Sequence, residues 1–268
     1  REIKANGRLG FALLGGPSCQ AVETENVTVV TRDGRQYTGV VEMQNASVHV
    51  NRELEEGKRD IKTLEILLDE NVQSREDVLA LGIQNGDVIC LDPRARVTPS
   101  GYIRSRFLDD KLSAGMLLEL ARAVAEGEVQ PERKTSLFFS VYEEVGHGAS
   151  AGIPDDTEDL LVVDMGCVGE GLSCTEQQVS ICAKDSSGPY DYAMTGELID
   201  LCQKHQLDYA VDVYPFYGSD AGAALRSGRD IRYALIGAGV YASHGYERSH
   251  VKGVENTLRL IEKYVEKA

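Results

Sequence analysis

The chain has 268 residues, enough for one large domain or two smaller ones, and its formal net charge at pH 7 is −15. Apolar residues make up 42% of the chain and charged residues 26%, as in ordinary globular proteins. Because nucleic acids and anionic membranes attract clustered Lys and Arg, this acidic balance argues against both as main partners.

The first hundred residues are predicted to be rich in short strands. Two β-branched runs within residues 26–44 flank Asp33-Gly34, and Asp-Gly is a strong hairpin signal. Ser74 as N-cap, with Asp77 three residues later, predicts the start of a short helix. Further strands are expected at 64–69 and 88–91. Short strands separated by turns favour a small β barrel or sandwich.

The pattern changes near residues 98–103, where we expect a domain boundary. Residues 112–125 have helical spacing, and residues 135–142 are an apolar run typical of a buried strand. Further strands are expected at 160–164, 178–183, 207–214 and 231–236, with helices at 190–205, 221–226 and 254–266. Strands that alternate with helices predict an α/β domain with a mixed, largely parallel sheet flanked by helices.

The cysteines and the apolar runs indicate the compartment. The six cysteines include no CxxC pair, and most lie between apolar residues, which is typical of buried thiols. The longest apolar stretches are far shorter than the roughly 20 residues of a membrane helix, and no signal peptide is visible. We therefore expect a cytoplasmic protein without a disulfide framework.

Three acidic clusters occur where the predicted strands end or the next helix begins. Asp109-Asp110 precedes the 112–125 helix, Glu143-Glu144 follows the 135–142 run, and Asp164 ends the next predicted strand. A single acid in such a place often caps a helix and faces water. Three clusters are harder to explain in this way, because the chain has no Lys or Arg between Lys134 and Lys184 to balance buried charge. Together with an imidazole in Ser243-His244-Gly245, they favour a divalent-metal site.

The segments that carry these residues resemble one family in their order. They are Phe107-Leu-Asp109-Asp110-Lys-Leu, Tyr142-Glu143-Glu144-Val-Gly146-His-Gly148-Ala149, Val163-Asp164, Gly218-Ser219-Asp220-Ala221-Gly222 and His244-Gly-Tyr-Glu247. The chain resembles, over its whole length, the glutamyl (tetrahedral) aminopeptidases, dinuclear metallo-aminopeptidases of which some are called endoglucanases. The resemblance implies a zinc-peptidase-like catalytic domain over residues 101–268 and an inserted small β-barrel domain, used in oligomerisation, over residues 1–100.

The resemblance also implies roles for individual residues. Asp109 would bridge two divalent metal ions, zinc or cobalt, and would be joined to the next residue by a cis peptide bond. Glu144 and His244 would bind one ion and Asp164 the other, while Glu143 would act as general base. Asp110, Ser219 and Asp220 would lie around the metals or against the substrate.

Several assignments within the resemblance stay open at this point. His250 is a rival to His244 as ligand, or simply an N-terminal residue of the last helix, and Ser219 has an alternative role as an N-cap. The family's first ligand histidine lies in an HxDxxG-like segment, and none of the five histidines here lies in such a motif. We expect that this part of the catalytic domain precedes Arg1 in a longer protein or is absent.

The leading function is therefore a metal-dependent aminopeptidase that acts on peptides and forms homo-oligomers, with a dodecamer as one form. A water or hydroxide shared by the two ions would attack the substrate, with Glu143 taking its proton. One alternative is a glycoside hydrolase with a carboxylate pair, which the 6% aromatic content and the lack of Trp disfavour. Another is a non-catalytic relative that acts as a binding or scaffold protein.

Overall fold

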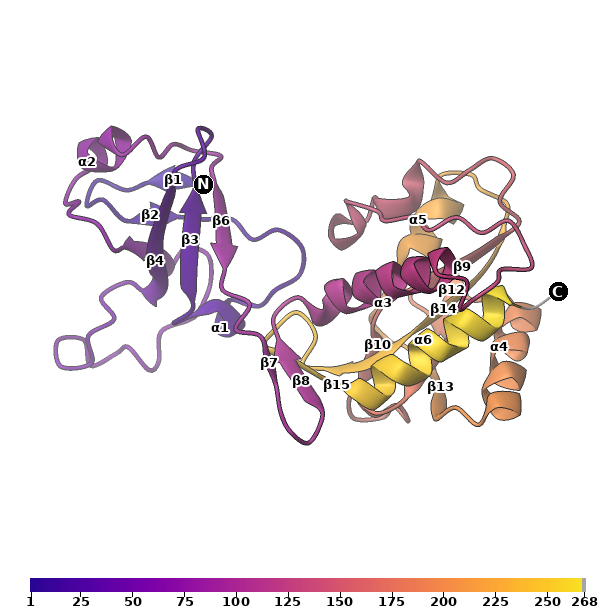
Figure 1. The fold of residues 1–268 in the computed structure, drawn as a ribbon. Helices are drawn as coiled ribbons and strands as arrows, with labels where there is room; N and C mark the ends of the chain where they lie inside the picture. The colour runs from indigo at the N-terminus through magenta and orange to yellow at the C-terminus, as the bar shows by residue number, and fades with distance from the viewer. Residues whose placement is uncertain (267–268) are drawn as a thin grey trace. The chain divides into compact units, whose positions relative to one another are not determined.

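The structure, a computed structural model, describes residues 1–266 and divides into two compact units. The first unit is Arg1–Pro93, and the second runs from Arg94 onward (Figure 1). Residues 98–101, where the sequence suggests a boundary, form the turn of a hairpin inside the second unit. This hairpin joins β7 (Arg96–Val97) to β8 (Tyr102–Ser105).

The first unit is an antiparallel sheet. Within residues 1–93 its strand order is β1 (Glu2–Ile3), β2 (Leu9–Gly10), β5 (Leu64–Leu68), β4 (Gln36–Met43), β3 (Asn26–Val30) and β6 (Val88–Leu91). Alternate residues of these strands point into one core, among them Val27, Val29 and Val41, because successive side chains of a strand face opposite sides. The helices are α1 (Cys19–Val22) and α2 (Arg75–Ala80).

Two local predictions for this unit are confirmed. The expected hairpin joins β3 to β4, with Gly34 at φ +85°, a conformation that glycine adopts without strain. The predicted capping box is present at α2: the Ser74 hydroxyl accepts from the Asp77 amide, and the Asp77 carboxylate accepts from the Ser74 amide.

The second unit is a mixed sheet with helices on both faces, so the predicted mixed α/β class is confirmed. The strand path runs β12 (Gly188–Pro189), β11 (Val179–Asp185), β14 (Arg232–Tyr241), β15 (Glu247–His250), β8 and β7. Three further strands add parallel pairs: β9 (Asp159–Val163) and β10 (Gly166–Val168) join β14, and β13 (Tyr209–Val213) joins β11.

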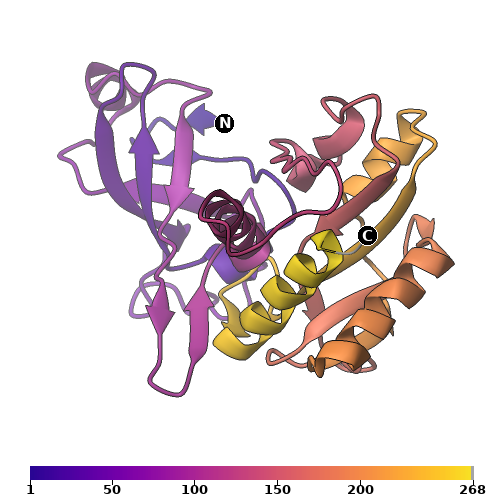
Figure 2. The same cartoon turned by 45° about the vertical axis from the view of Figure 1, so that its right-hand side comes forward.

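Both faces of this sheet are buried, and alternation along the strands decides which residue faces which layer. Ile181 and Ile236 pack against α3 (Leu108–Ala125), α4 (Tyr192–His205) and α6 (Val251–Val265). The neighbouring Cys182 and Leu235 lie in a separate cluster with Ala221 of α5 (Asp220–Arg226). In Figures 1 and 2, α4 and α6 lie side by side along the sheet. The central strands are therefore apolar at most positions.

Residues 135–142 differ from the prediction. The sequence suggests a buried strand, yet this segment pairs with no strand among residues 1–266, and Val141 is 84% exposed. An apolar run forms a strand only where a neighbouring edge accepts its backbone hydrogen bonds, and local sequence does not show whether that edge is available. The β9 strand uses one edge to pair with β14, and residues of β9 and of the 135–142 segment line a common cavity.

Within residues 1–266 we find no helix that has both the length and the apolar character needed to cross a membrane.

Candidate metal centre

The candidate site lies in the second unit, where β9 and β14 end. These two strands run parallel, so their carboxyl ends meet at the same edge of the sheet, where open α/β folds place ligands. Asp164 directly follows β9, and His244 lies in the loop that follows β14. Asp109 and Asp110 begin α3, and Glu143 and Glu144 lie in a short 3-10 turn, η1 (Glu143–Val145).

A first group combines one imidazole with two carboxylates. Ligand atoms of Asp109, Glu144 and His244 all lie within 4.8 Å of one another. The His244 Nε2 atom is 3.3 Å from Asp109 Oδ2 and 3.7 Å from Glu144 Oε2. The side chains of His244 and Glu144 are partly open to solvent, whereas that of Asp109 is almost covered. Nitrogen and carboxylate oxygen together are a donor set that suits zinc and similar ions.

A second group consists of carboxylates alone. Ligand oxygens of Asp109, Asp110 and Asp164 lie within 4.8 Å of one another, so Asp109 belongs to both groups. Burial, followed by the charge of Asp164, raises the pKa of Asp110 well above its usual range, and burial followed by the charge of Asp109 does the same for Asp164. Asp110, predicted to lie beside the metals, is thus close enough to serve as a ligand.

A buried carboxylate oxygen without a hydrogen-bond partner indicates that these residues fit a cation. Among the described residues, Asp110 Oδ1 is buried without a hydrogen-bond partner. An unpaired buried carboxylate oxygen is costly, and three carboxylates at this spacing repel one another. A divalent cation relieves both costs, because it supplies positive charge and takes oxygen ligands. The residues present therefore fit metal ions in both groups.

Glu143 lies beside the first group without belonging to it. Burial, followed by the charges of Asp220 and Glu144, raises the pKa of Glu143 to about 7. A carboxyl group that titrates near neutral pH can both accept and donate a proton under physiological conditions.

Asp220 fixes the loop that follows the glutamate pair. Its Oδ1 atom accepts a hydrogen bond from the Ala149 amide at 3.0 Å. Gly148 permits this approach, because a Cβ atom there would lie 1.9 Å from Asp220 Oδ1. Ser219 occupies the N-cap position of α5, but its hydroxyl bonds to the Tyr190 hydroxyl at 2.8 Å and does not cap the helix.

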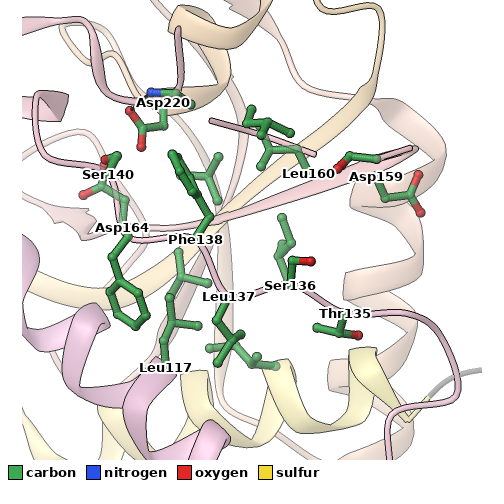
Figure 3. A pocket seen from close by; sticks show the side chains of 18 of the residues that line it. Leu117, Thr135, Ser136, Leu137, Phe138, Ser140, Asp159, Leu160, Asp164 and Asp220 are labelled. Atoms are coloured by element: carbon green, nitrogen blue, oxygen red, sulfur yellow. Dashed lines mark hydrogen bonds between the residues drawn. The ribbon is translucent and has the colours of Figure 1, made fainter. Parts of the chain in front are cut away.

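The carboxylates open onto a cavity of about 880 Å³. Asp110, Glu143, Glu144, Asp164 and Asp220 line it, and Ser219 is not among its lining residues. Its apolar wall includes Leu117, Leu137, Phe138 and Leu160. Figure 3 shows Asp164 and Asp220 toward one end and Asp159 toward the other. The volume is within the range of small-molecule and peptide sites.

The two candidate histidines have different surroundings. His250 is buried, with Nε2 2.8 Å from the Ser100 carbonyl oxygen and Nδ1 accepting from the Lys252 amide at 3.0 Å. Both of its ring nitrogens are occupied, and it caps the N-terminus of α6. The geometry therefore favours His244 as the ligand. His147, which follows the glutamate pair, is exposed.

The site also includes Glu247, to which the sequence motifs assign no role. Glu247, 1% exposed, accepts hydrogen bonds from the backbone amides of Asp109 and His244, at 3.0 and 2.9 Å. Burial raises its pKa to about 7 against the effect of these two bonds. Glu247 lies three residues after His244 in the same motif, and this is the sequence feature that could have indicated its place in the site. The peptide bond between Asp109 and Asp110 is cis, as the resemblance implies.

Comparisons with known proteins agree with the resemblance. The sequence model of the M42 glutamyl aminopeptidase family matches residues 1–260. The Bacillus subtilis (strain 168) protein YhfE, provisionally named an aminopeptidase, is 43% identical over 266 residues, which are 99% of this chain and 77% of YhfE.

Solved structures share the fold. A TET aminopeptidase from a marine sediment thaumarchaeote superposes with a TM-score of 0.85 at 19% identity, over 99% of this chain and 76% of that one. The TET1 peptidase of Pyrococcus horikoshii superposes with a TM-score of 0.83 at 21% identity, over 99% of this chain and 79% of that one. Identity at this level supports the fold, while the family rests on the sequence match over residues 1–260 and on YhfE. The chain belongs to the M42 glutamyl aminopeptidase family.

Proposed function

We propose that this protein is a metal-dependent aminopeptidase that uses two divalent ions, zinc or cobalt, to remove N-terminal residues from peptides. Family membership supports the peptidase function. The observation that carries the finer proposal is the double membership of Asp109, which shares one group with Glu144 and His244 and another with Asp110 and Asp164. A carboxylate has two oxygens, so a residue in this place can bridge two ions.

The proposed ligands divide between the two groups. Glu144 and His244 would hold one ion and Asp164 the other, and Asp109, which belongs to both groups, could contribute to each. When bound, the ions supply Lewis acidity that lowers the pKa of water and polarises the scissile carbonyl. Asp110 stands close enough to add a ligand or to contact the substrate.

We assign the proton transfer to Glu143, which lines the same cavity as two of the candidate ligands. Its carboxylate takes a proton from the attacking water and delivers it to the nitrogen of the leaving amine. Its place in the cavity that the candidate ligands Glu144 and Asp164 also line supports this role. Asp220 lines the same cavity and is proposed to contact the substrate, with Ser219 supporting it through the bond to Tyr190.

The proposal extends to assembly and location. The TET1 peptidase of P. horikoshii can assemble into a tetrahedron or a large octahedral shell. We propose that this chain also forms homo-oligomers, a dodecamer being one form, with the unit Arg1–Pro93 as the oligomerisation element. The predicted location remains the cytoplasm. A monomer in multi-angle light scattering would contradict the assembly.

Elemental analysis tests the metal centre directly. The protein is equilibrated with zinc or cobalt, desalted, and analysed for metal per chain. Two ions per chain, with peptide hydrolysis lost on chelation, support the proposal. Hydrolysis of glycosides that survives chelation would favour the carboxylate-pair alternative, and absence of both metal and turnover would favour a scaffold protein.

A further inference from the structure

Glu247 joins the two segments that carry the candidate ligands. Its Oε2 atom accepts a hydrogen bond from the Asp109 amide at 3.0 Å, and its Oε1 atom accepts one from the His244 amide at 2.9 Å. Asp109 begins α3, whereas His244 lies in the loop between β14 and β15. One carboxylate therefore connects two pieces of backbone that are distant in the sequence.

The sheet decides where Glu247 stands. Glu247 begins β15 and lies opposite Ser105 of β8, so it faces the chain just before it reaches Asp109. On its other side, β15 pairs with β14 through Tyr241 and Arg248. The strand pairings thus place the carboxylate between the start of α3 and the His244 loop.

Both connected segments have backbone conformations that need support. Phe107 and His244 have φ near +62°, the left-handed region that residues with a Cβ atom rarely adopt. Such conformations persist only where surrounding contacts hold them. Asp109 also departs from helical geometry, with φ −79° and ψ 104°. The amide of His244 and the amide of Asp109 are the two groups that Glu247 holds.

A carboxylate at position 247 is costly in its ionised form. Its side chain is almost completely buried and lies close to Asp109, so the two carboxylates repel each other. Two amide hydrogen bonds offset part of this cost. A neutral amide of the same size would reduce the repulsion, but it has one acceptor oxygen, whereas Glu247 uses one oxygen for each of the two backbone amides.

We propose that Glu247 is a positioning residue that sets the placement of Asp109 and His244 for metal binding. This inference rests on the proposed function, since it takes these two residues as ligands. Partners that orient metal ligands in this way usually contribute about 10–100-fold to metal affinity.

Glu247→Gln tests the inference with little change of size. Glutamine has one acceptor oxygen, and its amino group would face one of the two backbone N–H groups, so one hydrogen bond is replaced by a clash of donors. We expect cobalt affinity, measured by titration, to fall about 10–100-fold. The visible spectrum of the bound cobalt should also change, because the ligands around it shift.

Asp212→Asn is a matched control. Asp212 is also buried and accepts from two backbone amides, those of Ser173 and Cys174, at 2.8 and 2.9 Å. The substitution makes the same chemical change in residues that are outside both metal-binding groups. We expect it to lower the unfolding temperature of the metal-free protein while cobalt affinity and spectrum stay as in the wild type.

The outcomes separate this inference from the proposed function. If the wild type binds no metal, the proposed function fails and the inference fails with it. If the wild type binds metal and Glu247→Gln binds equally well, or if both variants lose affinity equally, Glu247 has no positioning role. If Glu247→Gln does not fold, cobalt affinity is measured in Glu247→Asp instead. This variant keeps both carboxylate oxygens but moves them back by the length of one methylene group. Wild-type affinity in that variant would overturn the proposal.

Discussion

The imidazole Nε2 atom of His244 lies 3.3 Å from Oδ2 of Asp109, although the two residues are far apart in the sequence. β15 pairs with β8 on one side and β14 on the other, and this brings the His244 loop to the start of α3. The contact between the residues is therefore a product of the sheet, and the following expectations depend on it.

Replacement of His244 should affect metal binding, whereas replacement of His250 should affect stability. Loss of a residue that only orients a ligand lowers metal affinity by roughly 10–100-fold. Because His244 is proposed to be a ligand itself, we expect a larger loss of metal affinity in His244→Ala. In His250→Ala, loss of the cap on α6 should cost about 0.5–2 kcal/mol of unfolding free energy with metal content unchanged. Elemental analysis and thermal unfolding of both variants measure this, and the reverse pattern would make His250 the ligand.

Asp109→Asn should remove both ions together. Asp109 is common to the two groups of candidate ligands, so weakening it affects each of them. Metal per chain is measured after equilibration with zinc and desalting. Loss of a single ion would show that Asp109 serves one site alone and would exclude a bridge.

Glu143→Gln should abolish turnover while the metals stay bound. Glutamine cannot accept a proton from water, and general acid–base groups contribute about 10²–10⁴-fold to rate. Glu143 lies outside both groups of candidate ligands, so metal content should not change. The turnover number on a peptide substrate is compared with that of Glu170→Gln, which changes an exposed glutamate and should behave as wild type. Retained activity in Glu143→Gln would remove this residue from the proton-transfer role.

Gly237→Ala should destabilise the second unit. A Cβ atom at Gly237 would lie 1.8 Å from the carbonyl oxygen of Asp164, so β14 and the end of β9 would have to separate. Overpacking of this kind costs about 1–3 kcal/mol. Gly115→Ala is the control, because its Cβ meets nothing within 4 Å and alanine in a helix gains roughly 0.5–1 kcal/mol over glycine. Denaturant unfolding of both variants measures the change in unfolding free energy. Equal midpoints would mean that the strand end carrying Asp164 is not tightly packed.

Much of the local structure followed from the sequence. The Asp33-Gly34 hairpin, the capping box of α2 and most helices and strands of the second unit were predictable, because they depend on residues close together in the chain. The order of the acidic motifs also predicted the family, which the match over residues 1–260 confirmed. The roles of individual site residues stay predictions.

Other features depend on contacts that local patterns do not encode. Residues 135–142 have the composition of a strand, yet pairing needs a free neighbouring edge, and within residues 1–266 they pair with none. His250 was a rival to the predicted ligand His244, but the fold places His244 beside Asp109 and bonds both ring nitrogens of His250. Glu247 acquired its two amide partners only through the register of β15 with β8. Local sequence patterns show which chemical groups are available and on which elements they lie. Which of these groups meet depends on the fold, because metal-ligating distances are a few ångströms and only long-range strand pairing brings such distant residues that close.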